Sequence, residues 1–261
     1  MSDLIIEDLK DSILKITLNN LDQQNTLSLE FINDLKTIIE NADKNNDVNV
    51  IILASSGKVF SAGHNLKEIK SHRQDEDKGL KFFTMLINSC SDLMLKIINN
   101  SKPVIAEVNG IATAAGCQLV ASCDLAYASQ NSKFATPGVN IGLFCSTPMV
   151  ALSRVVNNKH SMEMLLTGDF ISAEKAKSIG LINNYFNEDH LVNEIKEMAI
   201  KIANKSSQTL KIGKKAFYNQ TEMTTYDAYK YASEIMIKNM MNQNSEEGIS
   251  AFLEKREPNW Q

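Results

Sequence analysis

Two loops of small residues in this sequence have the composition needed to bind an oxygen that carries negative charge. The first follows the apolar run 104–108, where Asn109-Gly110 marks a turn and Thr113-Ala114-Ala115-Gly116 leads into a helix-like segment at 117–121. Small residues at the start of a helix leave free backbone N–H groups open to a ligand, at the positive end of the helix dipole. Such groups bind an anion, or an oxygen that becomes anionic during a reaction. The alternative is that Ala and Gly only allow the strand and the helix to pack closely.

The second loop has the same character. The run 51–54 is typical of a strand, and Gly63 lies in the small-residue stretch that follows, where glycine accepts a backbone angle that turns the next N–H outward. Lys58 and Lys67 flank this loop. Two N–H groups from separate loops, meeting at one carbonyl oxygen with cations nearby, would suit a thioester that carries phosphates. The spacing alone does not show that the loops converge.

The elements that must position these loops are strands alternating with helices. Strands are expected near 4–8, 13–18, 51–54, 104–108, 125–128 and 133–135, and helices near 29–42, 83–97, 148–156 and 162–166. The charged segment 71–79 is expected to be a mobile surface loop. From about Ser206 onward the pattern is wholly helical and rich in Met, without a linker before it. No clean internal repeat is visible.

Several segments together resemble the crotonase (enoyl-CoA hydratase/isomerase) superfamily. They are FSAGHNLKEI (60–69), KPVIAEVNGIATAAGCQLVASCDLAYAS (102–129), LTGDFISAEKAKSIGLIN (166–183) and EEGISAFLEKREPNW (246–260), and the match runs in order over nearly all of the chain. TPGVNIGLFCSTP (136–148) is similar to the branch called enoyl-CoA hydratase domain-containing protein 3. The resemblance implies an α/β fold, a crotonase-like ββα superhelix over residues 1–205. Residues 206–261 would form a helical oligomerisation region that builds a homotrimer or a dimer of trimers, a hexamer.

The resemblance also implies a ligand and its site. Members of the family bind an acyl-CoA thioester and hold its carbonyl oxygen between two backbone N–H groups, which here fall at His64 and at Ala115, where Gly is common. This oxyanion hole stabilises the enolate that forms at the thioester. Coenzyme A is part of the substrate, and no separate cofactor is implied. The residues that match coenzyme A contacts are Lys58, Ala62, Asn65, Leu66 and Lys67, with Phe252 and Lys255 supplied by a neighbouring subunit. Leu21-Asp22 replaces a frequent Pro-Lys, which removes one cation.

Two departures from the family pattern concern the reaction itself. Hydratases of the family use two glutamates to place a water molecule and transfer its proton, and these positions hold Gln118 and Gly138. An amide can hold a water molecule but cannot exchange its proton near neutral pH. General acid–base groups contribute roughly 10²–10⁴ in rate each. True hydration is therefore doubtful, and we predict that crotonyl-type esters bind but are hydrated far more slowly than by a two-glutamate hydratase.

Other titratable groups near these segments have simpler interpretations. The His64 side chain titrates in a range that suits a base, although the resemblance uses only its backbone. Cys117 and Cys145 lie in the relevant segments, but buried cysteines are usually inert. Glu107 is expected to be paired, or solvated at a strand edge, and Asp124 to cap or orient the turn that follows it.

Three functions are compatible with these patterns to different degrees. The first is an enoyl-CoA hydratase-like, lyase-like enzyme of fatty acid metabolism that acts through an enolate, with its reaction undefined. The second is a non-catalytic acyl-CoA binding or regulatory protein of the same fold. The third, a serine hydrolase, is disfavoured because the sequence has no GxSxG motif. A metal enzyme is also disfavoured, since no His/Cys/carboxylate cluster has ligand spacing.

Composition limits the partners. A net charge of −4 and a pI of about 5.7 argue against a nucleic-acid or anionic-membrane partner. No segment approaches the roughly 18 apolar residues of a membrane span. The four cysteines lack CxxC spacing and lie in apolar surroundings, which favours reduced core thiols. Because the first residues lack a signal-peptide core or an Arg-rich pattern, the expected location is cytoplasmic.

Overall fold

The computed structural model describes residues 4–260. Its strands are β1 (Ile5–Lys10), β2 (Ile13–Leu18), β3 (Val50–Ser55), β4 (Val59–Ser61), β5 (Val104–Val108), β6 (Ile111–Thr113), β7 (Leu125–Ser129), β8 (Lys133–Ala135), β9 (Ile171–Ser172) and β10 (Asn184–Phe186). Its α-helices are α1 (Leu29–Lys44), α2 (Leu66–His72), α3 (Leu80–Ile98), α4 (Ala115–Ser122), α5 (Pro148–Val155), α6 (Asn158–Thr167), α7 (Ala173–Ser178), α8 (Glu188–Ala203), α9 (Ser207–Gln220), α10 (Thr225–Met240) and α11 (Gln243–Glu254). Two short 3₁₀ helices are η1 (Leu21–Gln23) and η2 (Pro137–Ile141).

The strands form two sheets, and the chain passes from the larger sheet to the smaller one several times in the same order. The larger sheet has the order β1-β2-β3-β5-β7-β10, in which only the β1–β2 pair is antiparallel. The smaller sheet has the order β4-β6-β8-β9. The pairs β3–β4, β5–β6 and β7–β8 each give one strand to each sheet before the chain enters helices. The expected strand–strand–helix spiral is therefore present, although its turns share too little sequence to be seen as a repeat.

Apolar periodicity explains which face each helix covers. The buried stripe of α1 includes Phe31 and Leu35, and that of α3 includes Leu86 and Leu93; together with the sheets they form the main core. Ser28 begins α1 by accepting the N–H of Phe31 at 3.2 Å. A second, smaller core lies on the other face of the larger sheet, under α8. Because β3 and β5 have helices on both faces, nearly all of their residues are buried, and all are apolar except Ser55 and Glu107.

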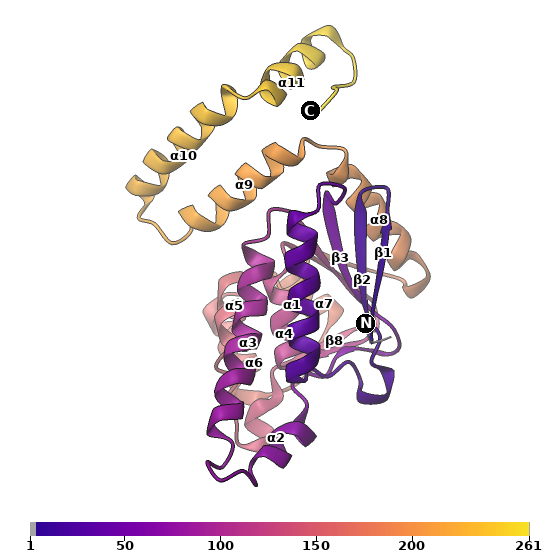
Figure 1. The fold of residues 1–261 in the computed structure, drawn as a ribbon, viewed down its shortest axis with the longest axis vertical. Helices are drawn as coiled ribbons and strands as arrows, with labels where there is room; N and C mark the ends of the chain where they lie inside the picture. Colours follow the sequence, from indigo (N-terminus) through magenta and orange to yellow (C-terminus); the bar gives the residue numbers. More distant parts are fainter. Residues whose placement is uncertain (1–3, 261) are drawn as a thin grey trace.

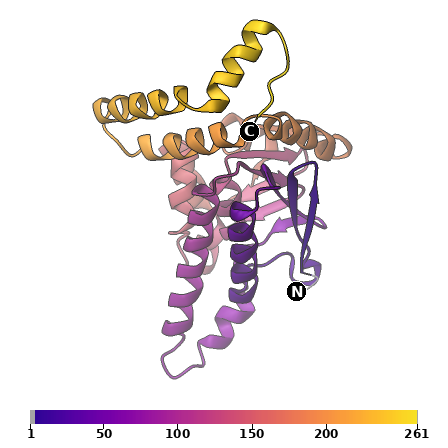
Figure 2. The same ribbon diagram turned by 45° about the horizontal axis from the view of Figure 1, so that its top comes forward.

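The chain after α8 is wholly helical, as the sequence predicts. Helices α9, α10 and α11 follow one another, and α10 and α11 extend beyond the rest of the molecule with α9 at their base (Figures 1 and 2). Their exposed faces carry large apolar side chains, among them Tyr226, Met236, Met241, Phe252 and Leu253. The side chain of Trp260 returns to donate to the Asn204 carbonyl at 2.9 Å. The domain boundary at residue 205 and the role of this region in oligomerisation remain predictions.

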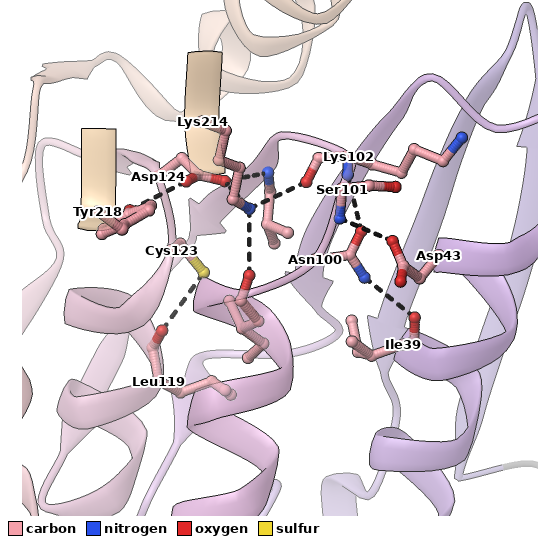
Figure 3. Close-up of polar contacts among 12 residues, drawn as sticks. Ile39, Asp43, Asn100, Ser101, Lys102, Leu119, Cys123, Asp124, Lys214 and Tyr218 are labelled. Atoms are coloured by element: carbon pink, nitrogen blue, oxygen red, sulfur yellow. Dashed lines mark hydrogen bonds and ion pairs between the residues drawn. The ribbon is translucent and has the colours of Figure 1, made fainter. Parts of the chain in front are cut away.

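A largely buried ion pair connects α9 to the core (Figure 3). The Lys214 ammonium lies 2.6 Å from Asp124 Oδ2 and also donates to the carbonyls of Ile97 and Lys102. Tyr218 donates to the other Asp124 oxygen at 2.9 Å. Asp124 also accepts the N–H of Val104 at 2.7 Å, so it does more than orient its own turn.

The expectation for the segment 71–79 needs correction, and of the two alternatives for Glu107 the paired one is confirmed. The segment 71–79 was expected to be a mobile loop, but its first two residues complete α2. His72 then stacks on Phe82 with ring centroids 3.7 Å apart and pairs with Asp75 at 2.7 Å. Glu107 is paired, 2.8 Å from the Lys15 ammonium, but it lies on the interior strand β5 and not at a sheet edge.

Candidate functional site

The two small-residue loops meet in the folded chain. Gly63 has a φ of +84°, and a β-carbon built on it would lie 3.0 Å from the Ala114 β-carbon and 3.3 Å from the Ala115 nitrogen. Its own carbonyl accepts the N–H of Leu27 at 2.8 Å, which holds the loop from the other side. The backbone that carries His64 therefore packs directly against the start of α4, which the sequence spacing alone could not establish.

The start of α4 has a strained backbone. Ala114, which precedes the helix, has φ 50° and ψ −118°, a conformation that is uncommon for a residue with a β-carbon. Its N–H donates to the Ala135 carbonyl at 2.9 Å, which anchors the turn. Such strain costs roughly 1–3 kcal/mol and is typical of functional sites. The Ala115 N–H is the first of the helix and has no acceptor within it, since the first four N–H groups of a helix lack one.

A groove of about 740 Å³ runs beside the His64 loop. Five residues predicted from the sequence line it: Ala62, His64, Asn65, Leu66 and Lys67. Sequence reasoning missed five further lining residues, and it noted Asp22 only as the loss of a cation. The five are Gln23, Gln24 and Thr26 from the segment between β2 and α1, and Glu68 and Ser71 from α2. Gln24 has a left-handed backbone, with a φ of 55°. Lys58 lies on an adjoining pocket of about 290 Å³.

Polar contacts fix the position of Asn65 in the groove wall and do not involve the ammonium groups of Lys58 and Lys67. Asn65 caps α2, because its Oδ1 accepts the Lys67 N–H at 3.0 Å, and its amide donates to Gln23 at 2.9 Å. Lys58 and Lys67 are both exposed, and neither forms an ion pair within residues 4–260. These two ammonium groups are therefore available to phosphates at the groove.

His64 is neutral at physiological pH. Burial lowers the pKa of its imidazole below the usual value, and the hydrogen bond with the Leu27 carbonyl, 3.3 Å from Nδ1, only partly offsets this effect. In the tautomer that donates from Nδ1, Nε2 is an acceptor, and it has no partner among the described residues. The side chain can thus accept a hydrogen bond but carries no positive charge.

The two positions that the sequence analysis matches to the hydratase glutamates differ in their surroundings. Gln118 lies on α4, is 4% exposed, and has room for its amide, whose Oε1 has no partner within residues 4–260. Gly138 has no such room, because a β-carbon there would lie 2.4 Å from the Leu143 carbonyl oxygen and 2.9 Å from Cys145 Sγ. The loop of residues 143–145 therefore occupies the space that a side chain at position 138 would need.

The thiols near this region are poor nucleophiles. All four cysteines are free and buried. Burial raises the pKa of Cys117 to about 12. Burial also raises the pKa of Cys145, and a hydrogen bond from the Gly138 backbone partly offsets this increase. The expectation of reduced core thiols agrees with these surroundings.

Phe252 and Lys255 are not brought to the groove within one chain. Phe252 is on α11 and 82% exposed, and Lys255 ends that helix with a φ of 57°. Helices α11 and α2 lie at opposite ends of the molecule (Figure 1). A role for these residues at the groove therefore needs a second subunit.

Residues 4–260 contain no group of three or more His, Cys, Asp or Glu side chains placed to hold a metal ion. Within the same range, no helix combines the length and the apolar character that crossing a membrane requires.

Comparison with known proteins places this geometry in a family. A sequence profile described as enoyl-CoA hydratase/isomerase matches residues 8–261. The protein named enoyl-CoA hydratase domain-containing protein 3, mitochondrial, from Xenopus laevis is 47% identical over 249 residues, which is 95% of this chain and 83% of the relative. The protein of that name from Homo sapiens is 46% identical over 250 residues, 96% of this chain and 81% of the relative.

Solved structures agree. The crystal structure of human enoyl Coenzyme A hydratase domain-containing protein 3 has a TM-score of 0.94 at 45% identity, covering 98% of this chain and 100% of that one. An enoyl-CoA hydratase from Mycobacterium smegmatis also has a TM-score of 0.94, at 43% identity and 99% coverage of both chains. The α/β crotonase-like fold and the branch inferred from the sequence are confirmed. The expected cytoplasmic location is wrong by this comparison, because these relatives are named as mitochondrial proteins.

Proposed function

This chain belongs to the enoyl-CoA hydratase/isomerase family, and we propose that it binds an acyl-CoA thioester with the carbonyl oxygen between the N–H groups of His64 and Ala115. The observation that supports this proposal is the packing of Gly63, the residue before His64, against the start of α4, which brings the backbones of the two loops together. The groove along residues 62–67 then receives the coenzyme A part, with Lys58 and Lys67 near its phosphates.

The chemistry of the pair follows from its position. Two N–H groups at a fixed place favour negative charge on the oxygen, so they stabilise an enolate more than the neutral thioester. The Ala115 N–H adds the dipole of α4 to this effect. Removing one such donor from an enzyme typically costs roughly 10²–10³ in rate. The use of main-chain groups explains why Ala at position 115 is compatible with this function.

Proton transfer is the weak part of the site. Gln118 can hold a water molecule but does not ionise, and Gly138 offers no functional group. His64, neutral and with a lowered pKa, is a weaker base than an ordinary histidine. We therefore expect binding of enoyl-CoA esters with hydration that is slower by roughly 10² or more than in a two-glutamate hydratase. The same observation favours the second candidate, a non-catalytic acyl-CoA binding protein.

The subunit arrangement is part of the proposal. The apolar faces of α9 to α11 suit burial against copies of the same chain, as a trimer or a dimer of trimers. Such an assembly would bring Phe252 and Lys255 of one subunit to the groove of the next.

Calorimetric titration with butyryl-CoA tests binding, and turnover of crotonyl-CoA separates the two candidates. The variant Gly63→Ala should weaken binding at least about tenfold, because its methyl group would press on Ala114 and separate the two loops. Gly142→Ala is the matched control, since Gly142 has a similar φ of +76° but open space around it. Equal affinity of Gly63→Ala and the unmodified protein would contradict the proposal.

A further inference from the structure

The residues after α11 fold back from the end of that helix to the junction between α8 and α9 (Figures 1 and 2). Lys255 ends α11 with a left-handed backbone, at a φ of 57°, which turns the chain away from the helix. The indole of Trp260 then donates to the carbonyl of Asn204, the residue that follows α8, at 2.9 Å. Residues 255–260, here called the tail, therefore connect the end of α11 to a distant part of the chain.

Glu247 on α11 holds the tail at two further points. Its two carboxylate oxygens accept from the guanidinium of Arg256 at 2.6 and 2.9 Å, and one of them also accepts the N–H of Asn259 at 2.7 Å. These contacts lower the pKa of Glu247 to about 2, so its carboxylate is charged at physiological pH. A bidentate pair of a guanidinium and a carboxylate fixes direction as well as distance. The tail is therefore held in one orientation on α11.

Trp260 packs on α11 at a position where a side chain is missing. A β-carbon built on Gly248 would lie 3.2 and 3.3 Å from two ring atoms of Trp260, so glycine leaves the space that the indole fills. The same indole reaches the junction between α8 and α9 through its hydrogen bond. Because α10 and α11 extend beyond the rest of the molecule, this contact ties the extension directly to the α8–α9 junction (Figure 1).

Phe252 and Lys255 lie at the point where the tail leaves α11. Both are exposed, and Arg256 directly follows Lys255. Because the guanidinium of Arg256 is fixed on Glu247, the backbone of this last turn is fixed as well. Side chains that are already in place when a ligand arrives bind more tightly than side chains that must be ordered first.

On the premise of the proposed function, in which Phe252 and Lys255 of one subunit reach the groove of the next, we infer that the tail sets the position of these two side chains. The positioning residues are Glu247, Arg256 and Trp260. The cation of Lys255 suits the phosphates of coenzyme A. Ligand binding and attachment of the tail are then coupled, and the coupling is reciprocal, because each strengthens the other by the same factor.

Calorimetric titration of Glu247→Gln with butyryl-CoA tests this inference. The affinity should fall about fivefold to tenfold, because the end of α11 must then be ordered on binding. Glu254→Gln is the matched control, since it removes the other carboxylate that contacts Arg256, 2.6 Å from Nε, and leaves the tail attached. Its affinity should stay within about twofold of the unmodified protein.

A double-mutant cycle separates positioning from general damage. In the background Phe252→Ala, Lys255→Gln, the further change Glu247→Gln should alter the affinity by less than about twofold, because the side chains that the tail positions are absent. A full additional loss in this background would overturn the inference. Light scattering shows whether the subunits stay together, and a loss of affinity that appears only with their dissociation would also overturn it.

The fluorescence of Trp260 reports on the tail, since it is the only tryptophan of the chain. Acrylamide quenching should increase in Glu247→Gln, and butyryl-CoA should decrease it in the unmodified protein. A released tail with unchanged affinity would overturn the inference. Where Glu247→Gln leaves the quenching unchanged, deletion of residues 256–261 removes the tail outright, and unchanged affinity of that variant would be equally decisive. Failure of the unmodified protein to bind butyryl-CoA would contradict the proposed function instead.

Discussion

Gly138 cannot carry a side chain without displacing its neighbours, and substitution there should be costly. A β-carbon at this position would lie 2.4 Å from the Leu143 carbonyl oxygen and 2.9 Å from Cys145 Sγ. Leu143 is tied to the same place, since its N–H donates to the Gly138 carbonyl at 2.9 Å. The first of these contacts is with backbone, so it cannot be relieved by rotating a side chain.

The expected cost of Gly138→Ala is therefore that of overpacking a buried site, about 1–3 kcal/mol of unfolding free energy. For a chain of this size that corresponds to a fall of roughly 2–12 °C in the thermal midpoint. Gly213→Ala is the matched control, because Gly213 lies within α9 with no neighbour inside 4 Å of a built β-carbon. It should stabilise the protein by about 0.5–1 kcal/mol, the usual gain from replacing glycine inside a helix.

Differential scanning calorimetry of the two variants measures this difference directly. The consequence for catalysis is that Gln118→Glu alone should raise crotonyl-CoA hydration, because the amide site accepts a carboxyl of the same shape. Adding Gly138→Glu should bring no further gain and should lower stability. Gly138→Ala with an unchanged midpoint, or a double variant far more active than Gln118→Glu, would refute this account of the loop.

The remaining predictions concern the ion pair, the histidine and the thiols. Asp124→Asn leaves the buried Lys214 ammonium without its counterion and should cost about 3–5 kcal/mol by urea unfolding, whereas Lys96→Met, which breaks an exposed pair, should cost about 1 kcal/mol or less. Burial lowers the pKa of His64 in the folded state below 6.5, its value in the unfolded chain. The neutral histidine therefore contributes to the unfolding free energy at pH values above 6.5, and this contribution is lost as the pH falls through the folded pKa. Unfolding free energies measured from about pH 7.5 to about pH 5.5 should therefore fall more in the unmodified protein than in His64→Gln, and parallel curves would contradict this. Burial raises the pKa of Cys90 and Cys117 to about 12, so Ellman's reagent should label both only after unfolding; rapid labelling of the native protein would show otherwise.

Much of the fold follows from local sequence patterns. The apolar stripes of α1 and α3 and the apolar runs of β3 and β5 predict those elements to within a few residues. The spiral repeat was not visible because its turns differ in sequence and share only their path between the sheets. The pairing of Asp124 with Lys214 was missed because 90 residues separate them and neither is unusual for its position.

Part of the candidate site is also visible in the sequence, and part of it needs the structure. The loops around His64 and Ala115 stand out by their small residues, and the resemblance to a family predicts that they form one site. Their convergence depends on Gly63 and the strained Ala114, which are properties of the folded backbone. The closed loop at Gly138 also needed the structure, since a missing glutamate in the sequence does not show whether room for it remains.

The measurement that tests the central claim most directly is the infrared difference spectrum of bound butyryl-CoA, with and without a carbon-13 label at the thioester carbonyl. If the N–H groups of His64 and Ala115 hold that oxygen, the carbonyl stretch of the bound ester should move to lower frequency than in water, and Gly63→Ala should reduce the shift. A bound ester whose carbonyl absorbs at or above its frequency in water would show that the two N–H groups do not hold it.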